Sequence, residues 1–296
     1  MVTTRTSKPE GRSAHFNWAA LGRVAPQGLV NARLLAHHAL QWPARAARAN
    51  LKSMPDDSHT GFDWDPALAA LMTQPIRTPA GEVRVGLRLA GLALLLVRNG
   101  AILDVLQLNG KPEQVVGVWI DVKLQALGLR PASAIKPPYD MPDHPLAHGA
   151  RYDLYMQERE LGELARWFGG SAAALEDVRG RLADLRPGTT PVRCWPHHFD
   201  IATVADLGAG GENARSIGIG VSPGDGYYAQ PYAYVSPSPR FDTRLSDPPK
   251  PGRWHTEGFF GAVATGEAIL GLPNRGQGLL AFFLDAIDIG RQRLGA

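Results

Sequence analysis

EVRVGLRLAGLALLLVRNGAILDVLQL, residues 82–108, is the stretch that decides the fold class of this 296-residue chain. Over residues 83–89, apolar side chains alternate with polar or small ones, as they do in a half-buried strand. Two further apolar runs, 92–97 and 102–108, lie on either side of Asn99-Gly100. Asn-Gly between apolar runs is a strong hairpin signal. The stretch therefore predicts an antiparallel meander.

Helical patterns flank this meander. Residues 29–51 form an amphipathic pattern that Pro43 is expected to kink or break, and residues 113–127 form a second one that ends at Gly128. The rest of the chain predicts helices over 157–168, 172–185, 258–270 and 276–293, and strands over 191–204, 215–221 and 227–235. Strands in adjacent hairpins, with helices grouped after them, favour the α+β class over a doubly wound fold.

Domain organisation follows from this order. We expect residues 1–14 to be a disordered basic tail and residues 15–296 to form one compact domain. Because both halves of the chain run from strands to a helix, a division into two similar sub-lobes, 15–150 and 151–296, is the alternative.

Composition excludes several classes of protein. Charged residues make up 20% of the chain and hydrophobic residues 44%, which excludes a disordered acidic chain, and 33 glycines with 24 prolines indicate many turns rather than a coiled coil. One cysteine, Cys194, excludes an intramolecular disulfide framework and predicts a cytoplasmic protein. The longest apolar run, 89–97, is too short to span a membrane, and no signal-peptide pattern is expected at the N-terminus.

The N-terminal region carries the positive charge. Residues 1–52 contain eight lysines and arginines and a single acid, Glu10. Such an arm can contact nucleic acid. The basic residues are spaced apart, however, and no aromatic and basic signature of RNA binding accompanies them. We therefore expect a solvated tail and no nucleic-acid partner.

The strongest candidate site is Trp195-Pro196-His197-His198-Phe199-Asp200. In a continuous strand, His198 and Asp200 would share one face and His197 would point to the other, unless Pro196 introduces a bulge. Imidazole and carboxylate together can bind a divalent metal ion or form a base and its orienting partner. The structural alternative is a hydrogen-bonded His–Asp pair that braces a sheet.

A second candidate is Trp254-His255-Thr256-Glu257-Gly258, which we expect to open a helix. Thr256 is a suitable N-cap and Glu257 suits the positive end of the helix dipole, which is the structural interpretation. The functional interpretation joins His255 and Glu257 to the first candidate. The predicted catalytic residues are then His197, Asp200, His255 and Glu257, and a zinc, iron or manganese ion is predicted on His197, Asp200 and His255.

The remaining candidate residues would bind the substrate. They are His37 and Gln41, one turn apart on the first helix, with Asp225 and the aromatic side chains of Trp195, Tyr232 and Trp254. A histidine on an apolar helix is also a common core residue. The prolines around His144 and His148 make a helical HxxxH metal pair unsuitable there.

The segment Gly220-Val221-Ser222-Pro223-Gly224 matches the nucleophile elbow of α/β-hydrolases. Pro223 has no N–H for an oxyanion, and a strand pattern rather than a helix follows. A hairpin turn organised by Ser222 and Asp225 is therefore the better interpretation.

Several pieces of the chain together resemble an uncharacterised bacterial family of domains of unknown function. They are HHFD at 197–200, SIGIGVSPGD at 216–225, PYAYVSP at 231–237, LLAFFLDAI at 279–287 and LLAHHALQ at 34–41. The resemblance aligns His37, Gln41, His197 and Asp200 with that family's pattern and leaves out His198. The family has no assigned activity, so the resemblance implies no reaction.

Two functions follow from these features. The first is an enzyme that acts on a small molecule by acid–base or metal-assisted chemistry, with hydrolysis as the reaction class. The second is a non-catalytic protein that holds a small ligand or a peptide in an aromatic-lined cleft. The sequence predicts no oligomeric state.

Overall fold

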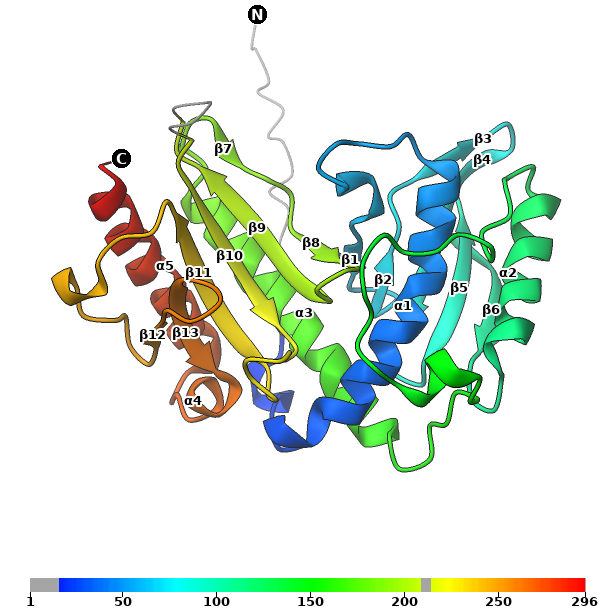
Figure 1. The fold of residues 1–296 in the computed structure, drawn as a ribbon, viewed down its shortest axis with the longest axis horizontal. Helices are drawn as coiled ribbons and strands as arrows, with labels where there is room; N and C mark the ends of the chain where they lie inside the picture. Colours follow the sequence, from blue (N-terminus) through cyan, green and yellow to red (C-terminus); the bar gives the residue numbers. More distant parts are fainter. Residues whose placement is uncertain (1–15, 209–213, 296) are drawn as a thin grey trace, which may run out of the picture.

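The computed structural model describes residues 16–208 and 214–295, and it combines helices with two antiparallel sheets (Figure 1). This is the α+β class that the sequence predicts. The expected basic tail, residues 1–14, lies outside the described residues.

The first sheet contains the predicted meander. Its order is β1 (Asp63–Asp65), β2 (Ala70–Met72), β4 (Gly81–Arg88), β5 (Ala93–Arg98) and β6 (Ala101–Gln107), and β3 (Ile76–Thr78) pairs with the other end of β4. At the turn between β5 and β6, Asn99 and Gly100 have φ values of 50° and 81°. Two consecutive positive φ values suit the tight turn that Asn-Gly favours, so the predicted hairpin is confirmed.

The second sheet is built from the C-terminal half of the chain. Its order is β12 (Arg253–His255), β13 (Gly261–Thr265), β11 (Tyr232–Ser238), β10 (Ser216–Ser222), β9 (Asp200–Asp206) and β7 (Gly188–Thr189), while β8 (Arg193–Trp195) also pairs with β9. All of these pairs are antiparallel.

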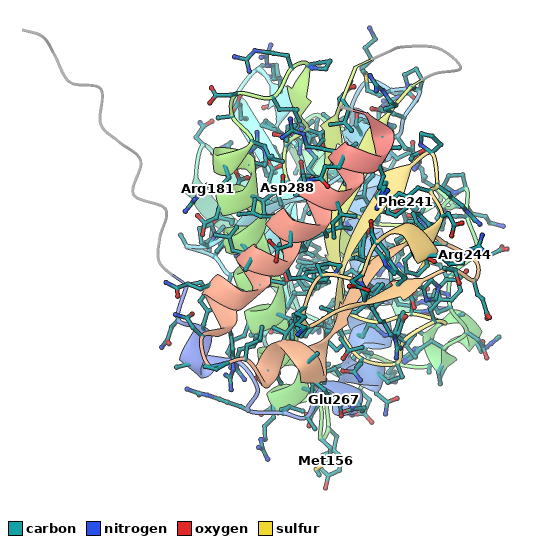
Figure 2. The ribbon with its side chains drawn as sticks, turned by 90° about the vertical axis from the view of Figure 1, so that its left-hand side faces the viewer. Met156, Arg181, Phe241, Arg244, Glu267 and Asp288 are labelled. Atoms are coloured by element: carbon teal, nitrogen blue, oxygen red, sulfur yellow. The ribbon has the colours of Figure 1, made fainter. Side chains whose placement is uncertain are left out.

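Long helices cover one face of each sheet. α1 (Val30–Asn50) contacts β4 and lies beside α2 (Glu113–Ala126), and it runs through Pro43 without ending there. α3 (Glu158–Arg181) and α5 (Arg275–Leu294) lie next to each other on the second sheet, as the helices that carry Arg181 and Asp288 show in Figure 2. Within the described part of the chain, no helix has the length and apolarity that crossing a membrane requires.

Short helices complete the chain: α4 (Gly266–Leu270) and the 3₁₀ turns η1 (Trp18–Ala20), η2 (Pro26–Leu29), η3 (Ser58–Thr60), η4 (Pro145–His148) and η6 (Thr243–Leu245). One cluster of buried apolar side chains joins the two sheets, and it includes Leu40 of α1, Leu94 of β5, Leu175 of α3 and Ile219 of β10. Both halves follow the order helix, meander, helix. The single domain and its two sub-lobes stay predictions.

Glycines explain one difference from the predicted helices. Residues 157–185 were expected to form two helices, but α3 is continuous through Gly169 and Gly170. A Cβ on Gly170 would lie 2.9 Å from the ring of Phe16, and one on Gly169 would lie 3.3 Å from the same ring. These glycines therefore let an aromatic side chain approach the helix and do not end it.

The predicted helix over 258–270 is wrong for most of its length. β13 occupies its centre and only α4 is helical. A Cβ on Gly261 would lie 2.6 Å from the backbone oxygen of Val235 in β11, so Gly261 permits the close approach of two strands. Val263 and Ala264 are both buried, one on each face of the sheet. A strand that is buried on both faces lacks the alternation of apolar and polar residues by which a sequence predicts a strand.

A buried carboxylate connects the start of the described chain to α3. Glu163 is fully buried and accepts hydrogen bonds from the backbone N–H groups of Gly22 and Arg23. Arg166 donates two further hydrogen bonds to it, at 2.6 and 2.9 Å. This carboxylate therefore holds the segment that leads into α1.

Candidate functional site

The segment from Trp195 to Asp200 is a turn between two strands. β8 ends at Trp195, β9 begins at Asp200, and the N–H of Phe199 donates to the backbone oxygen of Trp195 at 2.7 Å. Phe199 has a φ of 57°, which is uncommon for an aromatic residue. The continuous strand predicted over 191–204 is therefore wrong, and so are the side-chain directions derived from it.

Tertiary contacts hold this turn in place. The Phe199 ring is buried, with its centroid 5.0 Å from that of Phe168 in α3 and 5.2 Å from that of His37 in α1. The His37 and Phe199 rings are stacked, with an interplanar angle of 10°. This packing offsets the cost of the positive φ, which is of the order of 1 kcal/mol.

The first helix contacts the turn through His37 and Gln41. His37 Nε2 lies 2.8 Å from the backbone oxygen of Pro196, and Gln41 Nε2 donates to the same oxygen at 3.0 Å. Because a carbonyl oxygen only accepts, His37 carries its proton on Nε2 and Nδ1 is an acceptor. Burial lowers the pKa of His37 to about 4, so the ring is neutral. Tyr139 donates to the Gln41 Oε1 atom at 2.8 Å.

Asp200 begins β9, and its side chain is buried. The Tyr234 hydroxyl of β11 donates to Asp200 Oδ2, whereas Oδ1 has no hydrogen-bond partner within the described residues. Burial raises the pKa of Asp200 above its ordinary value. Gly220 of β10 stands between the two strands and pairs with both Ala202 and Tyr234, so its missing side chain leaves room for the tyrosine hydroxyl.

A second acid–tyrosine pair lies in the connection from β10 to β11. Asp225 Oδ1 accepts the N–H groups of Tyr227 and Tyr228 at 2.8 and 3.1 Å, and Oδ2 accepts the Tyr232 hydroxyl. The Ser222 Oγ atom accepts the N–H of Gly224 at 3.1 Å. A strand follows Ser222 and not a helix. The hairpin turn organised by Ser222 and Asp225 is therefore confirmed, and the segment lacks the form of a nucleophile elbow.

Arg33 of α1 adds a positive charge beside this pair. It lies one helical turn before His37, and its charge interacts with Asp225 and with Tyr232. Arg33 Nε is buried without a hydrogen-bond partner, and no ion pair of Arg33 occurs within the described residues. Burial lowers the pKa of Arg33. Since Arg33 Nε has no acceptor within the described residues, the guanidinium keeps a donor to offer.

The strand residues of this site, Asp200, Ser222, Tyr232 and Tyr234, share one face of the second sheet. Strand pairing sets Gly220 opposite Tyr234 and Ser222 opposite Tyr232. Ile217 is on the other face of β10. Its Cδ1 atom lies 3.0 Å from the position that a Cβ atom would take at Gly290 of α5. The helices α3 and α5 thus cover the opposite face. We name the set Arg33, Asp200, Ser222, Asp225, Tyr232 and Tyr234 the Asp200 cluster.

Other predicted site residues lie beside this cluster and make different contacts. His255 ends β12, where its Nδ1 atom lies 2.9 Å from the Tyr228 hydroxyl and its ring stacks on Phe259 at 4.0 Å. Its Nε2 atom contacts the backbone oxygen of Glu257 at 2.6 Å, and not the carboxylate. Since no helix begins at residue 257, the predicted helix N-terminus at His255 and Glu257 is wrong. Trp254 packs on Phe260 and donates to the backbone oxygen of Ser246.

His197 contacts aromatic rings rather than carboxylates. Its ring centroid lies 4.2 Å from that of His198, 5.8 Å from that of Tyr139 and 5.9 Å from that of Trp195. Burial, together with His198, lowers the pKa of His197 to about 4. Across residues 16–208 and 214–295, no three His, Cys, Asp or Glu side chains form a group that could hold a metal ion. The predicted metal set of His197, Asp200 and His255 is therefore without structural support.

Sequence reading missed Arg33, Tyr234 and Gly220. Arg33 is four residues before His37, so it shares that residue's helical face, and Tyr234 is two residues after Tyr232, so it shares that residue's strand face. Both shared faces can be predicted from the residue spacing once the helix and the strand are known.

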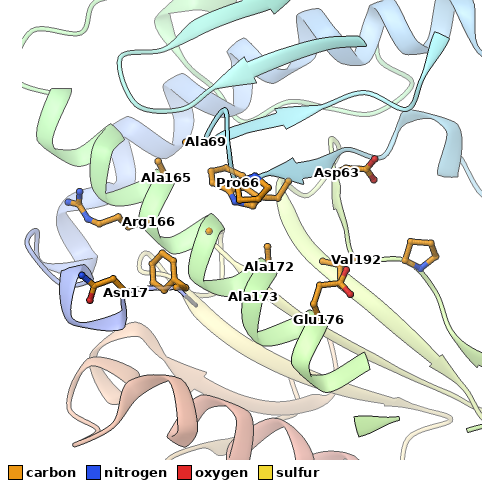
Figure 3. A pocket seen from close by; sticks show the side chains of 14 residues that line it. Asn17, Asp63, Pro66, Ala69, Ala165, Arg166, Ala172, Ala173, Glu176 and Val192 are labelled. Carbon is orange, nitrogen blue, oxygen red and sulfur yellow. The ribbon is translucent and has the colours of Figure 1, made fainter. Parts of the chain in front are cut away.

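A cavity of about 670 Å³ lies elsewhere, between α3, β1 and the residues before β8 (Figure 3). Its lining is mostly apolar and includes Trp64, Pro66 and Val192. Its charged lining residues already have partners, because Arg166 pairs with Glu163, Asp63 with Arg84 and Glu176 with Arg179. Among the buried side-chain atoms of the described residues that have no hydrogen-bond partner, Asp200 Oδ1 is the one carboxylate oxygen, and this makes the Asp200 cluster the stronger candidate site.

Comparisons with known protein families, with curated proteins and with solved structures find no match for this chain. The resemblance to an uncharacterised bacterial family stays a prediction.

Proposed function

We propose that this protein is an enzyme that acts on a small anionic molecule, with Asp200 as proton donor and Arg33 as the anion-binding residue. The observation that carries the proposal is the buried Asp200 Oδ1 atom, which has no hydrogen-bond partner within the described residues. Buried polar atoms are almost always paired, and an exception calls for an explanation such as a ligand or a catalytic role. Asp200 is 8% exposed, so this explanation is needed here.

The chemistry follows from the two oxygens of this carboxyl group. Burial raises the pKa of Asp200, which favours the protonated acid. Because Tyr234 donates to Oδ2, the proton of the acid belongs on Oδ1, the atom without a partner. When Asp200 gives this proton to a substrate, the Tyr234 hydroxyl stabilises the carboxylate that forms. This is the arrangement of a general acid.

Anion recognition falls to Arg33. A guanidinium offers donors in a planar fork that matches a carboxylate or a phosphate. Asp225 lies close enough for its charge to act on Arg33, yet the two form no ion pair and the Asp225 oxygens are already occupied by Tyr227, Tyr228 and Tyr232. A bound anion would supply the acceptors that Arg33 lacks.

A non-catalytic binding protein is the second candidate, and an aromatic group beside the cluster favours it. The rings of Tyr227, Tyr228 and Phe259 surround His255, with centroids 4.0 to 5.5 Å from it, and Tyr227 is 54% exposed. Tyr228 and Tyr232 are also in ring contact at 4.8 Å, which connects this group to the Asp200 cluster. Such rings could hold the apolar part of a ligand without any proton transfer.

Calorimetric titration with phenyl phosphate and with benzoate tests the anion site. Arg33→Met keeps an unbranched, flexible side chain and removes the charge, and Arg77→Met, at an exposed position of β3, is the matched control. A charge-assisted hydrogen bond contributes about 1.5–3 kcal/mol, so Arg33→Met should weaken binding about 10- to 100-fold while the control leaves it unchanged. If the wild-type protein binds neither anion, the anion site at Arg33 is wrong.

Turnover of phenyl phosphate, measured as release of phenol, separates the two candidates because the phenolate leaving group needs a proton from a general acid. Asp200→Asn should lower kcat about 10²- to 10⁴-fold, the usual contribution of a general acid, with anion binding retained. Tyr234→Phe should lower kcat less, since the acid itself remains. Anion binding that depends on Arg33, without turnover of any substrate, would favour the binding protein.

A further inference from the structure

The cavity beside α3, which we name the α3 cavity, lies where the two sheets meet (Figure 3). β1 of the first sheet and the turn after it form one wall, and α3 forms another. Pro191 and Val192, which lead into β8 of the second sheet, complete the lining. Its volume of about 670 Å³ falls within the range of about 300–1,000 Å³ that small-molecule sites occupy, often between packed units of a protein.

The α3 cavity is elongated along its helix. Its lining residues on α3 extend from Ala165 to Glu176, which at about 1.5 Å per residue is a length of about 16 Å. Arg166 lies toward one end and Glu176 toward the other, with Ala172 between them (Figure 3). A cavity of this length and volume has room for a molecule of more than one ring.

Two aromatic rings of the lining are held in place by neighbouring rings. A Cβ at Gly169 would lie 3.3 Å from the Phe16 ring and 3.4 Å from the Trp64 ring, so both rings reach the same turn of α3. The Phe16 ring contacts Trp18 edge-on at a centroid distance of 5.1 Å. The Trp64 ring stacks on Phe168 at 6.3 Å. Rings that are fixed before binding lose little entropy on contact with a ligand, and they favour a ligand that is itself aromatic.

The charged groups of the lining leave no net charge for a ligand to pair with. Each already has a partner of opposite charge within the described residues: Arg166 with Glu163, Asp63 with Arg84, and Glu176 with Arg179. An ionised ligand would therefore bring an unpaired charge into mostly apolar surroundings, which is strongly unfavourable. The lining selects an uncharged ligand.

We propose that the α3 cavity binds an uncharged aromatic molecule, at a site separate from the Asp200 cluster. Apolar cavities in proteins take up uncharged aromatic molecules such as benzene. The chain next to Phe16 does not supply a matching occupant by composition, because Met1, Val2 and Ala14 are the apolar residues among residues 1–15. α3 covers the face of the second sheet opposite to the Asp200 cluster, so the two sites can be tested independently.

N-phenyl-1-naphthylamine, an uncharged probe that fluoresces in apolar surroundings, tests the proposal in the full chain. The wild-type protein should give a saturable increase in fluorescence with one probe per chain, and naphthalene should displace the probe. 2-Naphthoate has the same rings with one negative charge, so it should displace the probe at least about 10-fold less well than naphthalene. Because displacement reports only the probe's own site, binding of 2-naphthoate at Arg33 does not disturb this comparison.

A pair of phenylalanine variants locates the probe. Ala173→Phe places a ring in the α3 cavity and should weaken probe binding at least about 10-fold, because the new ring takes apolar contacts from the probe. Gly180→Phe is the matched control on the same helix, outside the lining, where a Cβ would meet no atom within 4 Å. It should leave the affinity unchanged. Circular dichroism and thermal unfolding show whether each variant is folded, and Ala173→Met replaces Ala173→Phe if the larger ring prevents folding.

Three outcomes would overturn the proposal. The first is a wild-type chain that shows no saturable probe binding. The second is equal displacement by naphthalene and 2-naphthoate, which would exclude selection for an uncharged ligand. The third is equal affinity of the folded Ala173 and Gly180 variants, which would place the probe outside the α3 cavity.

Discussion

Replacing Gly220 with alanine tests whether the space left by this glycine holds Asp200 and Tyr234 together. A Cβ at Gly220 would lie 2.5 Å from the Tyr234 hydroxyl oxygen, 2.6 Å from its Cζ atom and 2.9 Å from the Ala202 Cβ atom. Favourable contacts between carbon atoms are about 3.5–4.0 Å, so the tyrosine ring must move by about 1 Å. Such a movement removes the hydrogen bond to Asp200.

The expected magnitude combines three effects. Overpacking costs about 1–3 kcal/mol, and loss of a hydrogen bond to a buried carboxyl costs about as much again. Alanine in a strand recovers about 0.5–1 kcal/mol of the entropy that glycine loses on folding. Gly220→Ala should therefore lower the free energy of unfolding by roughly 2–4 kcal/mol.

Gly218→Ala is the matched control on the same strand and the same face. Its Cβ would lie 3.8 Å from the backbone oxygen of Ser236 and 3.9 Å from the Ser236 Cβ atom, which are ordinary contacts. Urea unfolding followed by circular dichroism measures both variants. If Gly220→Ala and Gly218→Ala have the same stability within about 0.5 kcal/mol, the steric argument is refuted.

Two further predictions concern buried carboxyl groups. Burial raises the pKa of Asp200 in the folded protein above its value in the unfolded chain. The contribution of Asp200 to the free energy of unfolding is therefore greatest below the unfolded pKa and is lost as the pH rises toward the folded pKa. The loss is at most about 1.4 kcal/mol per pH unit. Asp200→Asn should therefore gain stability over the wild type as pH increases from 4 to 7, and parallel urea-unfolding profiles would contradict this. Glu163→Gln should lower the free energy of unfolding by about 1.5–3 kcal/mol because it removes the buried charge that Arg166 and two backbone N–H groups contact, whereas Glu158→Gln, at an exposed position, should change it by less than about 0.5 kcal/mol. An equal effect of the two glutamine variants in thermal unfolding would show that Glu163 is not a stabilising contact.

Elements with local signals were predictable. The meander over 82–108 combines alternation with an Asn-Gly turn, and both signals depend only on neighbouring residues. The helices now seen as α1, α2 and α5 have apolar periodicity that extends over three turns or more. The strand β13 was not predictable because both of its faces are buried, which removes the alternation.

The candidate site was predictable only in part. Asp200, Asp225 and Tyr232 were among the predicted residues, and they lie in one cluster. His255 was added on the expectation of a helix that is a strand instead. Arg33 is not among the predicted residues because an arginine on a helix is usually exposed to solvent. The packing of α1 beside the second sheet partly buries it.

The sequence by itself determined the α+β class, the first meander, the long helices and the turn chemistry of Ser222 and Asp225, because each depends on residues close together in the chain. Tertiary structure alone decided which chemical groups meet. Arg33, Asp200 and Tyr234 come from α1, β9 and β11, and the local sequence around each carries no information about the other two. The raised pKa of Asp200 and its unpaired oxygen arise from burial between those elements, which is a property of the assembled fold and not of any segment.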